Sequence, residues 1–388
     1  MRSIIIWSAL SATIISASEL KPASDDIQVP APWKVGKCIK EYCNFANPTM
    51  GDGLVLISTP ANVDILNSFS PLIKSNSQSP PFEVREIPGK GIGLFANRTI
   101  QRGEIVMQYT PTLIVQFGPH IDLPSSDRES FYQDAVTHLP SPRRDAFMAQ
   151  FGKDIFTKID RNAFRMFING QNPYSGHLGA FPEVARMNHD CRPNLNSRIE
   201  NITHSSIAVR TIAVGEELTI SYIDGLLPRQ ARQERLQDWG FECTCSLCSA
   251  SAEEVEASDK RIQDIKDLEE EMDKAVGGGD LTTEMGERLV KLYREEGLET
   301  YIGHAYTKAA LIYAMFGVEE KAKEYATLAA DAMAMELGEE AGDVVAMRQL
   351  AERPEEHWAW EIRKPRSEEE NEQVKKEQEA RESVKDEL

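Results

Sequence analysis

Positive charge is in short supply in this sequence. Its 388 residues include 43 Lys and Arg against 62 Asp and Glu, which gives a formal net charge of -19. A protein that binds a nucleic-acid backbone directly needs a basic face, so the composition argues against that class of partner. The acidity is compatible with a Lys-rich, basic protein partner, although it also serves plain solubility.

Long apolar runs and cysteines are scarce as well. No segment reaches the about 20 consecutive apolar residues of a membrane-spanning helix, so we expect no membrane span. The 6 cysteines are too few for a disulfide scaffold in a chain of this length. Cys38 and Cys43 form either a local disulfide in an oxidising compartment or two separate thiols in a reducing one. No Ser-His-Asp set and no catalytic pair of carboxylates stands out.

The two ends of the sequence resemble targeting signals. Residues 1–18 combine Arg2 with a short apolar run and small residues, a pattern typical of a secretory signal peptide. A buried N-terminal helix or strand is the alternative. The last four residues, 385–388, spell Lys-Asp-Glu-Leu, the retention signal of the endoplasmic reticulum lumen, and sequons begin at Asn97 and Asn201. We therefore expect a luminal or secretory-pathway location; a nuclear or cytoplasmic pool is the alternative, because free thiols risk oxidation in the lumen.

Changes in composition divide the rest of the chain. Residues 19–81 are rich in Pro, Ser and Asn, and we expect this extension to be partly a linker. Residues 82–224 alternate strand-like runs with Gly-rich turns around one helical stretch, which predicts a mostly β domain of the α+β class. In residues 251–365, small residues recur at helical spacing and predict an all-α, tetratricopeptide-like module. The charged residues 366–388 predict a solvated or disordered tail.

Three short segments carry residue types that binding and catalysis use. The turn GKGIGLF lacks Cβ atoms at Gly91 and Gly93, so a ligand could pack flat against its backbone. Residues 186–194, RMNHDCRPN, group polar side chains that rarely cluster in a core without a reason, although a capped turn also explains them. Residues 216–222 end a predicted strand at Tyr222, which could also be an edge tyrosine with a satisfied hydroxyl.

Four of the cysteines have the spacing of a metal site. Cys243, Cys245 and Cys248 supply three thiols within six residues, and Cys191 is available as the fourth. Soft sulfur ligands favour zinc, and four of them fill its tetrahedral coordination. We therefore predict a structural zinc site, with pairwise oxidation of the thiols as the alternative.

Four segments in this order resemble the SET domain of protein-lysine methyltransferases: GKGIGLFA, RMNHDCRPN, GEELTISY and WGFECTCSLC. The resemblance extends from about residue 82 to residue 248. Within that family the sequence most resembles the SET-and-MYND proteins and their fungal relatives, which also end in helices. Two features depart from that pattern. No cysteine lies between Cys43 and Cys191, so the MYND zinc finger is absent, and Asp190 stands where the family usually has Ser.

The resemblance implies a cofactor, S-adenosylmethionine, and a substrate, the lysine side chain of a protein such as a histone or another basic protein. Gly91, Gly93 and Leu94 would hold the cofactor through their backbone. Asn188 and His189 would lie in the threaded part of the fold and bind the amino-acid and adenine ends of the cofactor. The oligomeric state is not implied.

The resemblance also assigns the catalytic side of the site. Tyr222 would stand beside the methyl group as the catalytic residue, in addition to contacting the cofactor. Phe241 would cover the adenine, with Trp239 as a weaker candidate, and the zinc would pin this post-SET segment, residues 225–250, over the cofactor. Transfer would be an in-line displacement by a neutral lysine amine. A catalytically silent SET scaffold that binds partner proteins through its helices is the alternative.

Overall fold

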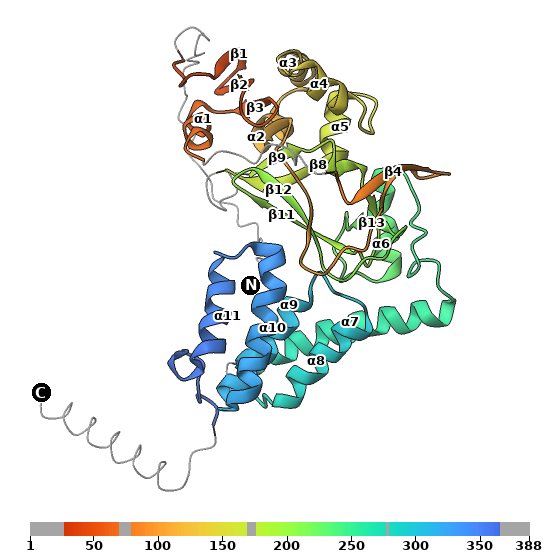
Figure 1. Cartoon of the computed structure of the whole chain (residues 1–388), viewed down its shortest axis with the longest axis vertical. Helices are drawn as coiled ribbons and strands as arrows, with labels where there is room; N and C mark the ends of the chain where they lie inside the picture. The colour runs from red at the N-terminus through yellow and green to blue at the C-terminus, as the bar shows by residue number, and fades with distance from the viewer. Residues whose placement is uncertain (1–26, 70–78, 169–175, 277–278, 365–388) are drawn as a thin grey trace, which may run out of the picture.

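The computed structural model describes residues 27–69, 79–168, 176–276 and 279–364. An N-terminal lobe, a central β region and a C-terminal helical region follow one another along the longest axis of the molecule (Figure 1). The expected leader at 1–18 and the expected tail at 366–388 lie outside the described residues. Within the described residues, no helix is long and apolar enough to cross a membrane.

A six-stranded sheet forms the core of the N-terminal lobe and contains strands from two distant parts of the chain. Its order is β1-β2-β3-β7-β9-β8, in which only the β3–β7 pair is parallel. The strands are β1 (Lys34–Ile39), β2 (Tyr42–Asn47), β3 (Leu54–Ser58), β7 (Leu113–Gln116), β9 (Gly176–Ala180) and β8 (Ala163–Phe167). The surrounding helices are α1 (Pro60–Asn67), α2 (Phe117–Asp122), α3 (Ser125–Thr137), α4 (Ser141–Met148) and α5 (Ile155–Asn162).

Residues 34–67, within the extension that we expected to be partly a linker, form three strands and a helix of this lobe. The reason lies in β3: all five of its residues are buried. Such a short apolar run is typical of a fully buried strand, which has no alternation to mark it in the sequence.

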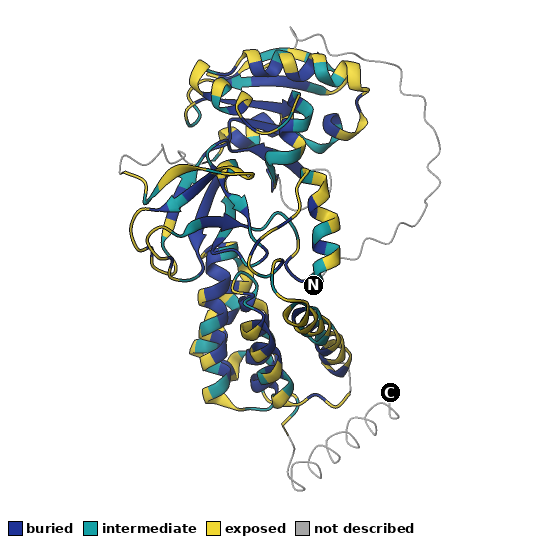
Figure 2. Ribbon diagram, turned by 90° about the vertical axis from the view of Figure 1, so that its right-hand side faces the viewer, coloured by how far each residue is buried: buried dark blue, intermediate teal, exposed yellow. Residues whose placement is uncertain are grey.

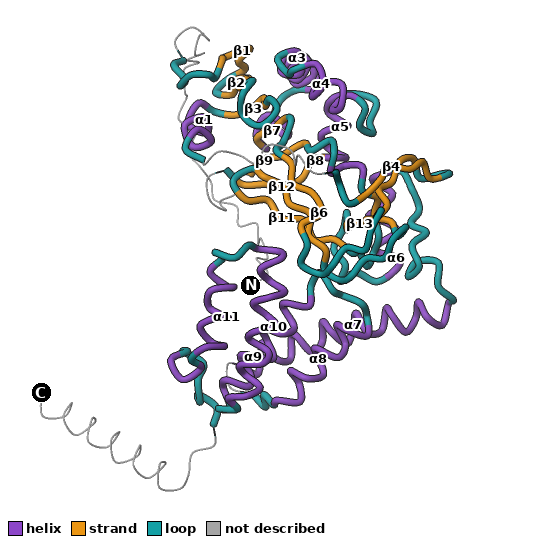
Figure 3. Tube along the Cα trace, in the orientation of Figure 1, coloured by secondary structure: helices purple, strands orange, loops and turns teal. Residues whose placement is uncertain are grey.

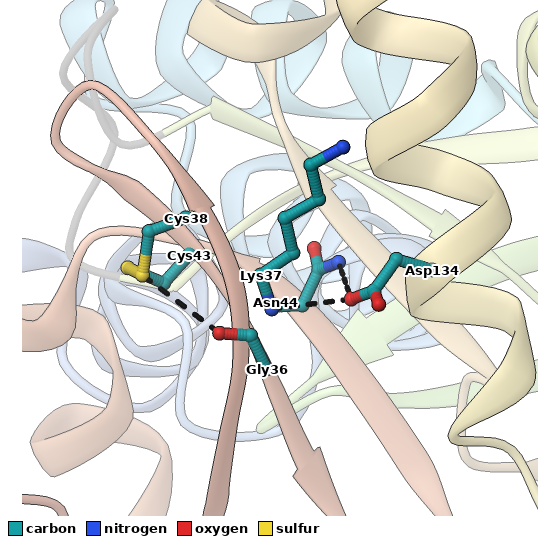
Figure 4. Close-up of a disulfide and its surroundings, with 6 residues drawn as sticks. All are labelled: Gly36, Lys37, Cys38, Cys43, Asn44 and Asp134. Carbon is teal, nitrogen blue, oxygen red and sulfur yellow. Dashed lines mark hydrogen bonds between the residues drawn. A yellow bond between two sulfur atoms is a disulfide. The ribbon is translucent and has the colours of Figure 1, made fainter. Parts of the chain in front are cut away.

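A disulfide joins Cys38 to Cys43 across the β1–β2 hairpin, so the structure selects the first of the two alternatives for these cysteines (Figure 4). Beside it, the Asp134 carboxylate of α3 accepts hydrogen bonds from the Lys37 backbone N–H at 3.1 Å and from the Asn44 amide at 2.8 Å. Burial raises the pKa of Asp134, but these hydrogen bonds outweigh it and leave the pKa lowered. The hairpin is thus fixed both covalently and against α3.

The central region contains two smaller sheets (Figure 3). One has the order β10-β13-β5-β4, and the other the order β11-β12-β6. Their strands are β10 (Asn188–His189), β13 (Glu217–Ile220), β5 (Gly91–Ala96), β4 (Phe82–Ile87), β11 (Leu195–Glu200), β12 (Thr203–Ala208) and β6 (Ile105–Tyr109). Helix α6 (Arg229–Leu236) and a 3-10 turn, η4 (Gln237–Trp239), lead out of this region.

Between residues 252 and 352 the described part of the chain contains helices and no strands, which confirms the predicted all-helical region and the α+β class. The helices are α7 (Ala252–Val276), α8 (Thr283–Glu295), α9 (Ile302–Met315), α10 (Glu319–Leu337) and α11 (Gly342–Glu352). Their buried faces point toward one another (Figure 2). Small residues allow this: a Cβ added to Gly286 of α8 would lie only 3.1 Å from the Cα of Ala309 in α9.

The helical region also packs against the central sheets. Ile207 of β12 and Leu226 belong to the same buried cluster as the helix residues. The Arg198 guanidinium of β11 donates a hydrogen bond of 2.6 Å to the Ala334 carbonyl near the end of α10. The two regions therefore share an apolar core as well as polar contacts.

The close approach of α8 and α9 predicts that Ala309→Leu destabilises the protein by about 1–3 kcal/mol, because the added methylenes overpack a fully buried position. Chemical denaturation of the whole chain would measure this. Thr327→Leu, at an exposed position of α10, is the control and should change the free energy of unfolding by less than about 0.5 kcal/mol. Equal effects of the two substitutions would contradict the packing account.

Candidate active site and metal centre

One sheet brings together the segments that the sequence singled out. Strand β13 pairs in parallel with β10, where Asn188 lies opposite Thr219, and antiparallel with β5, where Leu94 lies opposite Leu218. The Asn188 amide reaches from β10 toward β5 and donates hydrogen bonds to the Glu217 carboxylate at 2.7 Å and to the Ile92 carbonyl at 3.2 Å. The glycine turn, the Asn-His pair and the strand before Tyr222 thus form one continuous backbone surface.

The two glycines of the turn have different roles in this surface. Gly91 has a φ of +80°, which favours glycine, and a Cβ added there would meet nothing within 4 Å. A Cβ at Gly93 would lie 2.9 Å from the Glu217 carboxylate and 3.1 Å from the Asn188 amide. Gly91 therefore leaves open space for a ligand, whereas Gly93 leaves room for the Asn188–Glu217 hydrogen bond. Leu94 is buried between Leu218 of β13 and Val84 of β4, so its side chain is not available to a ligand.

His189 has both ring nitrogens engaged by the protein itself. Its Nδ1 accepts a hydrogen bond of 3.0 Å from the Tyr222 backbone N–H, and its Nε2 lies 3.3 Å from the Cys191 sulfur. Burial lowers its pKa to about 4, so the ring is neutral at physiological pH. Because Nδ1 accepts, Nε2 carries the proton and points it at the sulfur. The imidazole ring therefore connects the cysteine cluster to Tyr222. Only the backbone of His189 is then available to contact a cofactor.

Tyr222 lies at the centre of an aromatic group. Its ring centroid is 5.4 Å from that of His189, 5.7 Å from Trp239 and 6.4 Å from Phe241. The Tyr222 hydroxyl donates a hydrogen bond of 2.7 Å to the Met187 carbonyl. The Trp239 indole N–H donates to the Arg161 carbonyl at 2.9 Å, whereas Phe241 remains exposed. The structure thus brings Tyr222 together with both aromatic candidates from the segment that follows α6.

Four buried cysteines lie together below this aromatic group. The sulfur atoms of Cys191, Cys243, Cys245 and Cys248 all lie within 4.8 Å of one another. A tetrahedral zinc with Zn–S bonds of about 2.3 Å places its four sulfurs about 3.8 Å apart. The separations of 4.0 Å between Cys191 and Cys243 and 3.6 Å between Cys191 and Cys248 fit that arrangement.

Comparisons with known proteins agree with this geometry. Residues 91–223 match the family model described as "SET domain". That range covers β5, β10 and β13 and ends one residue after Tyr222. This chain contains a SET domain.

Curated relatives cover parts of the chain. Histone-lysine N-methyltransferase set5 of Schizosaccharomyces pombe is 31% identical over 48% of this chain and 54% of its own length. The human N-lysine methyltransferase SMYD2 is 29% identical over 42% of this chain and 39% of its own length. The human histone-lysine N-methyltransferase SMYD3 is 35% identical over 37% and 31%. The chain therefore spans about half the length, or less, of these relatives.

A buried arginine beside the SET domain provides an independent test of the metal. Arg232 of α6 is only 1% exposed, and its guanidinium donates to the Leu227 carbonyl at 2.6 Å and contacts the Cys248 sulfur at 4.0 Å. A buried cation with no negative partner is costly. Four thiolates around a divalent ion carry a net charge of -2, one unit of which Arg232 would offset, and the Asp259 carboxylate also acts on this guanidinium. The residues present thus fit a zinc centre.

Sequence reasoning missed Arg232 and a second arginine, Arg192. Helix α6 is polar nearly throughout, so nothing in its composition marks Arg232 as buried. Arg192 lies inside the RMNHDCRPN segment, but its partner Glu296 is 104 residues away in the helical region. Such a long-range ion pair has no local signal in a single sequence.

The geometry predicts one zinc ion per chain, held by four thiolates with no open position for chemistry. Elemental analysis of the purified full chain would detect it, and Cys245→Ser should lose the metal and lower the melting temperature. The matched control, the double substitution Cys38→Ser and Cys43→Ser, removes two sulfurs elsewhere and should retain the metal. A parent protein without metal, in which Cys191 forms a disulfide, would refute the site.

Proposed function

We propose that this protein is an S-adenosylmethionine-dependent protein-lysine N-methyltransferase. The observation that carries the proposal is the position of Tyr222, which joins a SET-domain sheet to the aromatic group of the cysteine-bound segment. The curated relatives are named as lysine methyltransferases, which agrees with the proposal. The substrate class is a lysine side chain of a protein, and the acidity of the chain favours a basic one.

The cofactor fits the open side of the sheet. The backbone around Gly91 and that of Asn188 and His189 would hold it, and the exposed ring of Phe241 would cover its adenine. When bound, S-adenosylmethionine supplies a methyl group activated by a sulfonium charge. The remaining work, which is to orient the amine and exclude water, falls to side chains of this protein.

The Tyr222 hydroxyl would act as an orienting group. Burial, and to a smaller extent the Glu217 carboxylate, raise the pKa of Tyr222 to about 12. The phenol therefore stays protonated at physiological pH and cannot serve as a base. The Tyr222 hydroxyl donates its hydrogen bond to the Met187 carbonyl. Its oxygen lone pairs therefore remain free to accept a hydrogen bond from a lysine amine.

The amine itself must be neutral to attack. An unperturbed lysine has a pKa near 10.4, and removal from water lowers that value. The rings of Tyr222 and Trp239 provide an apolar surface for the lysine stem. No strongly basic side chain is then required, because desolvation favours the uncharged amine.

We predict that Tyr222→Phe lowers turnover by about tenfold or more, a loss of at least about 1.4 kcal/mol of transition-state stabilisation, and leaves cofactor affinity nearly unchanged. Steady-state rates and cofactor titration would separate the two effects. Tyr313→Phe, which removes a hydroxyl that donates to Glu287 within the helical region, is the control and should turn over like the parent. If Tyr222→Phe also matches the parent rate, the assigned role is wrong.

The activity can be tested without knowing the substrate. The purified chain is incubated with a complete cell lysate and S-adenosylmethionine that carries a labelled methyl group, and labelled peptides are sequenced by mass spectrometry. We expect label on lysine side chains, absent when the chain is omitted. A chain that binds the cofactor but labels no lysine in any lysate would favour the silent scaffold.

We further propose that the protein resides in the lumen of the endoplasmic reticulum. The Cys38–Cys43 disulfide supports an oxidising environment. Asn201 is exposed in the turn between β11 and β12, outside the paired strand residues, so a glycan there would not disturb the strand pairing. Asn97 is also exposed, but its side-chain amide donates a hydrogen bond of 3.0 Å to the Pro80 carbonyl.

This location predicts a glycan on Asn201 of the protein expressed in its own cells. Glycosidase treatment should reduce the mass, and Asn201→Gln should remove that shift. Asn196→Gln, at an asparagine outside any sequon in neighbouring β11, is the control and should keep it. An unglycosylated protein that keeps its first residues and is imaged in the nucleus would exclude the lumen.

A further inference from the structure

A buried carboxylate links the helical region to the loop that carries Cys191. The side chain of Glu296, directly after α8, is fully buried. It accepts hydrogen bonds from the Arg192 guanidinium at 2.5 Å, from Arg261 of α7 at 2.8 Å and from the Ser258 hydroxyl at 2.5 Å. Arg192 also donates through Nε to the Glu296 backbone carbonyl at 2.7 Å. Glu296 thus holds α7, α8 and the SET-domain loop together.

Arg192 also contacts the two chain segments that flank the site. Its guanidinium donates to the Cys191 carbonyl at 2.6 Å and to the Gly225 carbonyl at 3.1 Å. Cys191 is two residues after His189, and Gly225 is three residues after Tyr222. One side chain therefore connects the Asn-His loop to the chain segment that leaves β13.

A second contact from the helical region reaches the same glycine. The Gly225 backbone N–H donates a hydrogen bond of 3.1 Å to the hydroxyl of Tyr301, which caps the start of α9. A Cβ added to Gly225 would lie 2.8 Å from the Tyr301 ring, so the two must approach closely. Gly225 is held between Arg192 on one side and Tyr301 on the other.

We propose that Glu296 is a positioning residue for the cofactor site, which acts through Arg192 although it belongs to the helical region. The inference rests on the proposed function, since it assumes that the loop at 188–192 binds S-adenosylmethionine. Removing the charge would leave two arginines facing a neutral group in a buried space. Arg192 lies on a loop and Arg261 on a helix, so the repulsion would displace the loop.

The charge can be removed without changing the shape by Glu296→Gln. We expect the Kd for S-adenosylmethionine, measured by calorimetry on the full chain, to rise about tenfold. The control is Glu287→Gln in α8, where the carboxylate accepts hydrogen bonds from two tyrosines of the helical region, Tyr313 at 2.8 Å and Tyr325 at 2.6 Å. It should leave the Kd unchanged.

A double-substitution cycle tests the route. If Glu296 acts through Arg192, then Arg192→Gln combined with Glu296→Gln should raise the Kd no further than the larger of the two single effects. Additive effects would overturn the route. An unchanged Kd in Glu296→Gln, or an equal rise in Glu287→Gln, would overturn the positioning role.

Hydrogen exchange separates this inference from the proposed function. In the protein without cofactor, backbone amides of residues 188–194 should exchange at least about tenfold faster in Glu296→Gln than in the parent or in Glu287→Gln. Faster exchange together with a parent that does not bind S-adenosylmethionine would retain the positioning role and reject the cofactor. If the parent binds S-adenosylmethionine but the exchange of residues 188–194 is unchanged in Glu296→Gln, the cofactor site is retained and the positioning role is rejected.

Discussion

Four sulfur atoms from two distant parts of the chain must lie within 4.8 Å of one another, and the rest of the site depends on this constraint. Cys191 follows β10, and its nearest partner in sequence is 52 residues later. Joining them places Trp239 and Phe241 beside Tyr222, and His189 beside Tyr222 and Phe241. Because His189 contacts a sulfur on one side and accepts a hydrogen bond from the Tyr222 backbone on the other, the cysteine cluster and Tyr222 form a single mechanical unit.

The helical region supports the same unit from the opposite side. Glu296 and Tyr301 fix Arg192 and Gly225, which flank the Asn-His loop and the end of β13. The shared apolar cluster around Leu226 and Ile207 gives these polar contacts a rigid base. A helical region attached only through a flexible linker would need neither the buried ion pair nor the close approach at Gly225. The two regions therefore act together in shaping the site.

Much of the site was predictable from the sequence because its signals are local. The spacing of Cys243, Cys245 and Cys248 indicated a metal site, and Cys191 was the available fourth ligand. The strand that ends before Tyr222 and the glycine turn were also identified from short patterns. The role of Gly93 was not, because the sequence does not show that Asn188 bonds Glu217 against it.

The N-terminal lobe and the inner support of the site could not be predicted for a different reason. Strand β3 reaches its sheet partner β7 across more than fifty residues, so no local pattern indicates the pairing. Arg232 lies in α6, a helix of mostly polar composition, and Glu296 directly follows α8; only the tertiary structure buries these two charges. Long-range pairing and buried charge are the two features that a single sequence conceals.

Calorimetric titration of the full, zinc-loaded chain with S-adenosylmethionine would test whether the backbone surface around Gly91, Asn188 and His189 binds the cofactor. We expect one saturable site per chain, abolished by removal of the metal and restored by adding zinc. Absence of binding to a folded, zinc-loaded protein would contradict it, and would leave the sheet and its aromatic group as a structural core without a cofactor.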